Sequence, residues 1–288
     1  MLGHIAELWR FPVKSMQGES LQSSAVHDTG LLGDRALALR DLQTGRIASA
    51  KSPRMWPNLL EFHAAFVEPP RPDQPLPAVK ITFPNGNDVT SDDPDVAQVL
   101  SNATGRAVEL VSSTPPGATF EHYLPDIDGA DPRGADTYTE SPNDIFGTGS
   151  LHDAAPIHLI TTATLDHLSE LYPQGDFDVR RFRPNVVVAT EETFAGFVEN
   201  DWVKNELMLG EVCIRLTAPM ARCVMVCRPQ PQLPEDVEIL RTVTKHNRPQ
   251  VLSMGLLPSV GVGGLVKQHG LARLRDPADL LHANPSQP

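Results

Sequence analysis

The amino-acid sequence predicts a mainly β protein of the α+β class, with many short strands and three or four helices. Three observations lead to this prediction. Apolar and polar residues alternate in short runs, which is the pattern of half-buried strands. The 288 residues include 27 prolines and 20 glycines, which interrupt regular elements, and only 6% of the residues are aromatic. The composition therefore favours short strands and loops over helical bundles, and the length allows two modest domains or one large one.

The first 112 residues are predicted to form strands joined by turns, with one helix. In the first strand, Ile5, Glu7 and Trp9 share one face. Asn85-Gly86 lies between two apolar runs, which is typical of a tight hairpin. A helix begins near residue 94 and stops at Gly105. The predicted strands cover residues 4–15, 21–27, 36–40, 61–68, 79–83, 88–90 and 108–112.

Residues 113–150 show no periodicity and are rich in Gly, Pro and Asp. We predict a long loop here, and a loop of this length inside a compact protein is usually functional or partly disordered. Residues 126–131 faintly resemble a calcium-binding loop, but they lack its full spacing and its closing Glu. A solvated loop is the default interpretation.

The second half of the chain changes pattern, with apolar strands followed by helices. Thr161 and Thr162 are predicted to cap a helix over residues 163–171. An apolar, strand-like run follows at residues 218–227, and Cys223 and Cys227 would lie on one face of it. The other predicted elements are strands at 155–160, 185–189 and 212–216, a turn or short helix at 178–182, a helix at 237–246, and strand and loop at 251–266.

Charge and composition exclude several classes of protein. The net charge is −12, which argues against a nucleic-acid or anionic-membrane partner. No run approaches the ~20 apolar residues of a membrane span, and residues 1–14 lack the apolar core of a signal peptide. The three cysteines do not suggest a disulfide framework. We therefore expect a cytoplasmic protein.

Arg222 and Cys223 form the most unusual pair in the apolar run. A neighbouring guanidinium stabilises a thiolate, and thiolates bind soft metals, so Cys223 is a candidate metal ligand. The competing interpretation is that Cys223, like Cys213 and Cys227, is a small buried hydrophobic residue. The spacing matches no structural zinc site, and a Cys223–Cys227 disulfide is geometrically poor along a strand.

Several basic and hydroxyl residues lie at strand ends or turns of this acidic chain. Guanidinium groups bind phosphate through two parallel hydrogen bonds, and helix N-termini also bind anions. If these residues converge, they would form an anion pocket; the alternative is solvated arginines and ordinary helix caps. The set comprises Lys14, Ser15, Arg35, Arg180, Arg181, Arg183 and Arg222, with Thr161, Thr162 and Thr164 at the helix start.

Five motifs, in order, resemble the MOSC family with its N-terminal β-barrel domain. Residues 9–18 (WRFPVKSMQG) resemble the family's opening motif, and residues 30–35 (GLLGDR) resemble the motif that follows it. The other three are residues 182–188 (FRPNVVV), 218–223 (APMARC) and 239–248 (ILRTVTKHNR). The resemblance implies a MOSC barrel formed by residues 1–35 and 150–288, and a smaller α+β domain over residues 36–125. A cofactor cleft would lie between them, with the 113–150 loop near its mouth.

The resemblance also implies a molybdopterin-type molybdenum cofactor. Carried over by position, Cys223 would be both the molybdenum ligand and the catalytic residue, and Asn185 would order the pocket. Pyridoxal phosphate binding is a further expectation for the family. The residues expected to hold the pterin and its phosphate are Lys14, Ser15, Arg35, Thr162, Arg183 and Arg222.

The function implied is a molybdenum oxidoreductase that reduces N-hydroxylated or N-oxide small molecules. A separate reductase or ferredoxin-like protein would supply electrons, because no flavin, haem or iron–sulfur motif is visible in the sequence. Two alternatives stay open. One is a sulfur carrier or transferase with a persulfide on Cys223, and the other is a non-catalytic module that binds the molybdenum cofactor.

Overall fold

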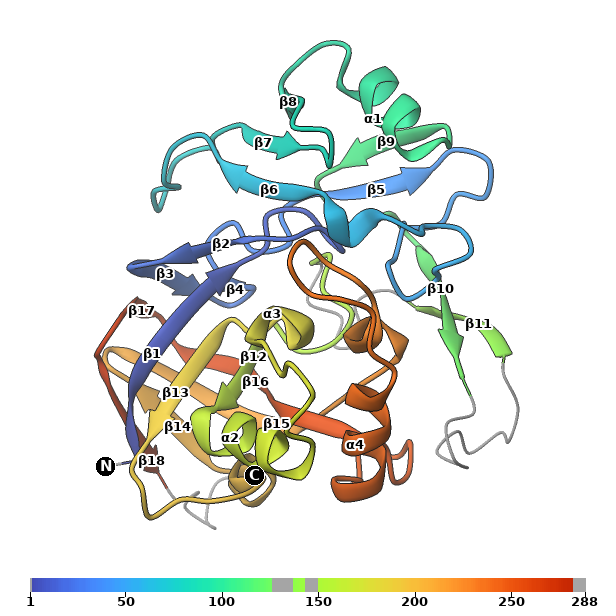
Figure 1. The fold of residues 1–288 in the computed structure, drawn as a ribbon. Coiled ribbons are helices and arrows are strands. Elements are labelled where there is room, and N and C mark those ends of the chain that lie inside the picture. The colour runs from blue at the N-terminus through green and yellow to red at the C-terminus, as the bar shows by residue number, and fades with distance from the viewer. Residues whose placement is uncertain (1, 126–136, 143–149, 282–288) are drawn as a thin grey trace.

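The computed structural model describes residues 2–125, 137–142 and 150–281. Figure 1 shows two lobes, a lower one containing most strands and an upper one containing β5 to β9 and helix α1. The first strand, β1 (Gly3–Arg10), belongs to the lower lobe although the upper lobe follows it in the chain. The fold is mainly β with few helices, so the predicted fold class is confirmed.

Seven strands of the lower lobe form a closed barrel. Each strand pairs with the next in the order β13-β12-β16-β15-β14-β18-β1, and β1 then pairs antiparallel with β13 to close the ring. Alternating apolar residues fill its interior, among them Leu8, Val188 and Ile214. Besides β1, the barrel strands are β12 (Ile157–Thr161), β13 (Val186–Thr190), β14 (Glu206–Leu209), β15 (Val212–Ala221), β16 (Ser259–Gln268) and β18 (Pro277–Leu281).

A β-bulge in β1 changes the face predicted for its side chains. The register against β13 shifts between Ile5 and Glu7, so Ile5 and Leu8 both point to the core. A strict alternation would have placed these two residues on opposite faces. The predicted grouping of Ile5, Glu7 and Trp9 on one face was therefore wrong beyond the bulge.

Short strands extend the barrel toward the upper lobe. Strand β2 (Glu19–Leu21) pairs with β1. A separate three-stranded sheet has the order β17-β3-β4, so it joins the two ends of the described chain. Its strands are β3 (Ser23–His27), β4 (Gly30–Leu31) and β17 (Gly270–Arg273).

The upper lobe has its own hydrophobic core, which includes Phe62, Ile81 and Leu100. The Asn85-Gly86 hairpin forms as predicted, and Gly105 ends α1 in a left-handed conformation. The elements are β5 (Ala38–Asp41), η1 (Leu59–Glu61), β6 (His63–Phe66), β7 (Val79–Thr82), β8 (Asp88–Thr90), α1 (Val96–Thr104) and β9 (Val108–Val111).

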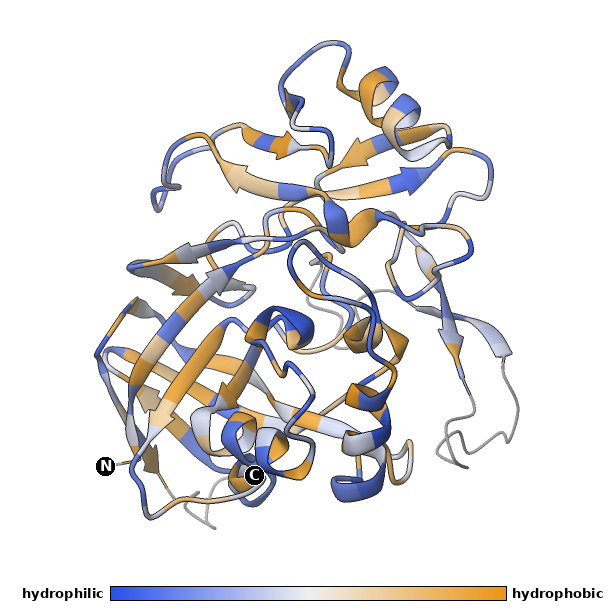
Figure 2. Cartoon of the chain, viewed as in Figure 1, coloured by the Kyte–Doolittle hydropathy of each residue, from blue (hydrophilic) through white to orange (hydrophobic). Residues whose placement is uncertain are grey.

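Residues 113–150 were predicted to be a loop, and this was wrong for part of the segment. Strands β10 (Thr119–Leu124) and β11 (Thr137–Pro142) pair antiparallel along their length. Figure 2 shows this hairpin in mostly pale or hydrophilic colours, in contrast to the barrel strands. The apolar alternation that identifies a strand is therefore weak here. The possible calcium loop at 126–131 lies outside the described residues.

Helices of the lower lobe pack in a second core against the barrel, with Leu168, Phe182 and Val243 inside it. The segment around Cys223 differs from the prediction. Strand β15 ends at Ala221, and Cys223 immediately precedes a 3-10 helix, so Cys223 and Cys227 do not share a strand face. The elements are α2 (Thr162–Leu171), α3 (Val179–Phe182), η2 (Val198–Trp202), η3 (Val224–Cys227) and α4 (Glu238–His246).

In the described parts of the chain, no helix combines the length and apolarity needed to cross a membrane.

Candidate functional site

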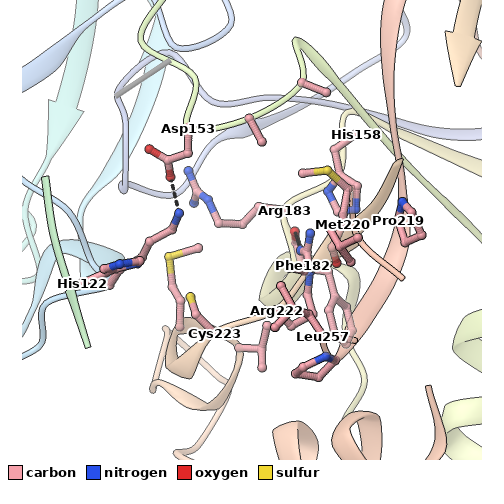
Figure 3. Close-up of a pocket in the computed structure, with 18 of the residues that line it drawn as sticks. His122, Asp153, His158, Phe182, Arg183, Pro219, Met220, Arg222, Cys223 and Leu257 are labelled. Atoms are coloured by element: carbon pink, nitrogen blue, oxygen red, sulfur yellow. Dashed lines mark hydrogen bonds and ion pairs between the residues drawn. The ribbon is translucent and has the colours of Figure 1, made fainter. Parts of the chain in front are cut away.

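A cavity of about 460 Å³ lies where the barrel, its helices and the upper lobe meet. Its wall includes Lys51 from the segment after β5, His122 from β10, and Cys223 from the start of η3. Figure 3 shows Asp153, Arg183, Arg222 and Cys223 around this space. Segments far apart in sequence therefore contribute to one site.

Cys223 is half-buried at the point where β15 gives way to η3. Strand β15 carries the chain along the barrel wall, and the tight 3-10 turn then directs residues 224–227 back into the helical layer. Cys213 and Cys227 are buried instead, and burial raises the pKa of Cys227 to about 12. Cys223 is thus the one described cysteine on the cavity wall.

Lys14 and Lys51 lie on either side of Asp153. Lys14 donates to Asp153 and, at 2.7 Å, to the Leu151 carbonyl oxygen; Lys51 Nζ lies 2.7 Å from Asp153 Oδ2. Burial lowers the pKa of Lys14 to about 8 although Asp153 opposes this effect. Burial alone would raise the pKa of Asp153, but the two ammonium groups hold it well below its usual range. Asp153 thus keeps two cations together in the cavity wall.

The pKa of Lys51 is raised. Burial alone would lower it, but Asp153 and then the Cys223 sulfur favour the ammonium form. The neighbouring residue Ala50 donates its backbone N–H to the Ser15 hydroxyl at 3.1 Å, which ties this segment to the start of the upper lobe. Lys51 was not predicted as a site residue, and its surroundings in the sequence contain no motif that would have identified it.

Arg35 and Arg183 both stack on the aromatic ring of Phe11. Their guanidinium carbons lie 4.5 and 4.2 Å from the centre of Phe11. Arg183 donates to the Met16 carbonyl oxygen at 2.6 Å, and burial followed by repulsion from Arg35 lowers its pKa to about 9. Two guanidinium groups that share one ring at the cavity wall suit an anion.

Asp34 anchors Arg35 from behind the cavity wall. Its fully buried carboxylate accepts hydrogen bonds from the Phe11 backbone N–H, His152, Asn185 and Arg35. Burial alone would raise the pKa of Asp34, but Arg35 and these donors hold it well below its usual range. The carboxylate therefore stays ionised and fixes the Arg35 side chain.

Asn185 and Arg222 connect elements around the cavity. Asn185 accepts from the His158 backbone N–H at 3.1 Å and donates to the carbonyl oxygen of Trp9 and to Asp34. Arg222 donates to the Phe182 carbonyl oxygen at 3.0 Å. Burial lowers the pKa of Arg222 to about 10, while the adjacent Cys223 sulfur favours the charged form.

The structure brings most of the predicted site residues together but leaves Thr162 outside the cavity. Its hydroxyl accepts from the Thr190 backbone N–H at 3.2 Å. At the N-terminus of α2, the buried Glu199 side chain accepts from the Thr161 N–H at 2.6 Å and from the Thr164 hydroxyl. The predicted site residues that line the cavity are Lys14, Ser15, Arg35, Arg183, Asn185, Arg222 and Cys223.

Charge is strongly unbalanced in this site. Among the described residues that line the cavity, five are cationic (Lys14, Arg35, Lys51, Arg183 and Arg222) and one, Asp153, is a carboxylate. The whole chain, in contrast, has a net charge of −12. Phosphate groups suit such a cluster, and a half-exposed thiol suits a soft metal, so these residues fit an anionic cofactor that contains such a metal.

The closed barrel and the basic cavity describe a β-barrel protein suited to hold an anionic ligand. Comparison with protein families makes the assignment specific. Residues 147–268 match the MOSC domain, and residues 2–102 match the MOSC N-terminal beta barrel domain. Together these matches cover well over half of the chain, which belongs to the MOSC family. The domain boundaries predicted from the sequence stay a prediction.

Curated relatives match nearly the whole chain. Mitochondrial amidoxime-reducing component 1 of Mus musculus is 23% identical over 298 residues, covering 97% of this chain and 83% of the relative. Mitochondrial amidoxime reducing component 2 of Rattus norvegicus is 25% identical over 299 residues, covering 96% and 82%.

Solved structures show only a distant likeness. The YUAD protein from Bacillus subtilis aligns with 99% of this chain and 98% of its own, at 9% identity and a TM-score of 0.40. YiiM from Geobacillus stearothermophilus aligns with 62% and 69%, at 14% identity and a TM-score of 0.31.

Proposed function

We propose that this protein is a molybdenum-cofactor-dependent reductase of N-hydroxylated or N-oxide compounds. The observation that carries the proposal is the half-buried Cys223 thiol in a cavity wall with five cations. The names of the curated relatives, which are amidoxime-reducing components, support the choice of substrate. Pyridoxal phosphate binding and a cytoplasmic location stay predictions.

Each cavity residue has a proposed task. Cys223 would provide the thiolate ligand, and Arg222 and Lys51 would stabilise its negative charge. Lys14, Arg35 and Arg183 would bind the anionic part of the cofactor, with Ser15 beside them. Asp34 and Asp153 would position these cations rather than contact the reacting atoms.

When bound, the cofactor would supply the two-electron redox chemistry. In the overall reaction, an N-hydroxylated substrate takes up two electrons and two protons, its N–O bond breaks, and the amine-type product and water leave. The electrons would come from a separate electron-transfer protein. The cavity walls would exclude bulk water and hold the N–O group near Cys223.

Metal analysis tests the proposal directly. Protein produced in a host that makes the cofactor should contain molybdenum, and Cys223→Ser should lose most of it, because a hydroxyl is a poor ligand for a soft metal. Cys213→Ser is the matched control, since Cys213 lies outside the cavity wall and is buried. Equal molybdenum in all three proteins, or none in the wild type together with no reduction of amidoximes, would overturn the proposal.

Sulfur transfer is the second candidate, because the half-buried Cys223 beside Lys51 could also carry a persulfide. Intact-protein mass spectrometry separates the two functions. A mass increase of about one sulfur atom that disappears in Cys223→Ser, without bound pterin, would favour the transferase.

A further inference from the structure

Strained backbone conformations gather at the cavity. Eight non-glycine residues in the described chain have a positive φ angle, and four of them line the cavity. Three are polar members of the proposed cofactor site, namely Ser15, Arg35 and Arg183, with φ between 47° and 65°. The fourth is Leu252, with φ of 48°. A leucine in this conformation is uncommon, and strain that persists often marks a functional position.

The loop after α4 holds Leu252 in this conformation. The Gln250 side chain donates to the Leu252 carbonyl oxygen at 2.7 Å, and the Val251 N–H donates to the Gly255 carbonyl oxygen at 2.9 Å. The base of the loop is closed by Asn247, whose side chain donates to the Ser259 carbonyl oxygen at 2.8 Å. These bonds present Leu252 and Met254 to the cavity, where each is 49% exposed.

The cavity wall has an apolar part as well as its basic part. The chain from η3 to β16 contributes Met225, Val226, Leu240, Val251, Leu252, Met254, Leu257 and Pro258. In the view of Figure 3, Leu257 lies below Arg222, whereas Asp153 lies on the upper side. The charged groups of an anionic cofactor would be held by the basic part of the wall, which leaves these half-exposed apolar side chains as a surface for an apolar group. Burying half-exposed apolar side chains under an apolar ligand is favourable.

We propose that the apolar wall selects the substrate and that Leu252 is its main specificity-determining residue. The occupant is the apolar substituent, an aryl or bulky alkyl group, of an N-hydroxylated compound. Its N–O group would face the basic part of the cavity and Cys223, while the substituent packs on Leu252 and Met254. The inference rests on the proposed function, which it deepens by naming the substrate class.

Two matched variants test this inference. Leu252→Asn removes the apolar contact but keeps a residue that tolerates the left-handed conformation, so the loop should fold normally. Leu256→Asn is the control, because Leu256 lies on the same loop, is 56% exposed and does not line the cavity. The probes are a phenyl amidoxime and a methyl amidoxime. Binding is measured by titration calorimetry, and KM and kcat are measured with a chemical electron donor.

The phenyl compound should bind Leu252→Asn about five- to tenfold more weakly than wild type, from loss of roughly half a leucine contact. The methyl compound should be unaffected, and Leu256→Asn should behave as wild type. An unchanged phenyl-to-methyl ratio in Leu252→Asn, or an equal loss in both variants, overturns the inference even if the protein reduces amidoximes. If the phenyl compound binds in a way that depends on Leu252 but is not reduced, the inference is supported and the proposed function is overturned. If neither amidoxime binds and neither is reduced, the inference and the proposed function are both overturned.

Discussion

Replacing Asp34 by Asn should strongly destabilise the fold, although the two side chains have nearly the same shape. The Asp34 carboxylate is fully buried and accepts hydrogen bonds from four donors, which are the Phe11 N–H, His152, Asn185 and Arg35. An Asn can keep an oxygen toward Phe11, but its NH₂ group then faces the other donors.

The magnitude follows from the loss of one partner of a buried ion pair, which typically costs about 3–5 kcal/mol. Arg35 is 14% exposed and keeps a contact with the Arg183 carbonyl oxygen at 3.4 Å, so some of its charge stays solvated. We therefore expect a loss near the lower end, about 3 kcal/mol in the free energy of unfolding. Urea denaturation measures this loss, with an unchanged m-value as evidence that the two-state transition is preserved.

A second Asp–His pair in the same protein serves as the control. Asp28 Oδ1 lies 2.8 Å from His269, but the Asp28 side chain is 85% exposed. Asp28→Asn should leave the unfolding free energy unchanged within error, because solvent screens the pair. If Asp34→Asn loses less than about 1 kcal/mol, or no more than Asp28→Asn, the argument from burial is refuted.

The buried pair of Asp34 and Arg35 also predicts how the stability of the fold changes at acid pH. The pKa of Asp34 is lowered in the folded state, so its stabilising contribution is complete above its unfolded pKa of about 3.9 and is lost as the pH falls below that value. Asp34→Asn should therefore approach the wild type in stability as the pH is lowered from 5 to about 2. A constant gap over this range would contradict the assignment.

Three further predictions concern other parts of the molecule. The pKa of Lys14 is about 8, so its positive charge is lost as the pH rises through that value. Pyrophosphate binding, measured by calorimetry, should therefore weaken between about pH 7 and 9, and it should weaken less in Lys14→Arg. An equal loss of affinity with pH in the wild type and in Lys14→Arg would refute this prediction. Burial raises the pKa of Glu199, so its ionisation destabilises the fold as the pH rises above the unfolded value of about 4.3. In urea unfolding, Glu199→Gln should therefore gain stability relative to the wild type as the pH rises from about 4 to 7. A stability difference between the two proteins that does not change with pH would contradict this prediction. Gly261 has φ of +77°, and an added Cβ would lie 2.3 Å from the Leu159 carbonyl oxygen. Gly86→Ala is the control, because a Cβ added there meets nothing within 4 Å. Gly261→Ala should lower the unfolding free energy by about 2 kcal/mol more than this control, and equal losses would show that the clash is relieved.

Local signals in the sequence predicted local structure well. Asn85-Gly86 forms the expected hairpin because its left-handed turn is favoured by those residues alone. Gly105 ends α1 for a similar reason. Hairpin β10–β11 was missed because its strands lack apolar alternation, as Figure 2 shows. The face of β1 was predicted wrongly after Ile5, since a bulge depends on the partner strand.

The site was predictable only where the residues belong to recognised motifs. Cys223, Arg35 and Arg183 line one cavity, although the sequence alone could not show that they meet. Lys51 was missed because its role depends on Asp153, about a hundred residues later in the chain. Thr162 was chosen because a helix start attracts anions, but its hydroxyl bonds the Thr190 backbone N–H and its neighbours Thr161 and Thr164 bond Glu199. Such competition between distant residues is not encoded in a local pattern.

Closure of the barrel by β1 has a consequence for how the protein is made. Strand β1 is synthesised long before its partners β13 and β18, which lie at residues 186–190 and 277–281. Such sequence-distant pairing slows folding, because a long loop must close before the contact is rewarded. The upper lobe can form its own core while β1 waits with an unpaired edge. Until both partner strands have been synthesised, a nascent chain of this protein therefore exposes an unpaired strand edge, which is a template for aggregation.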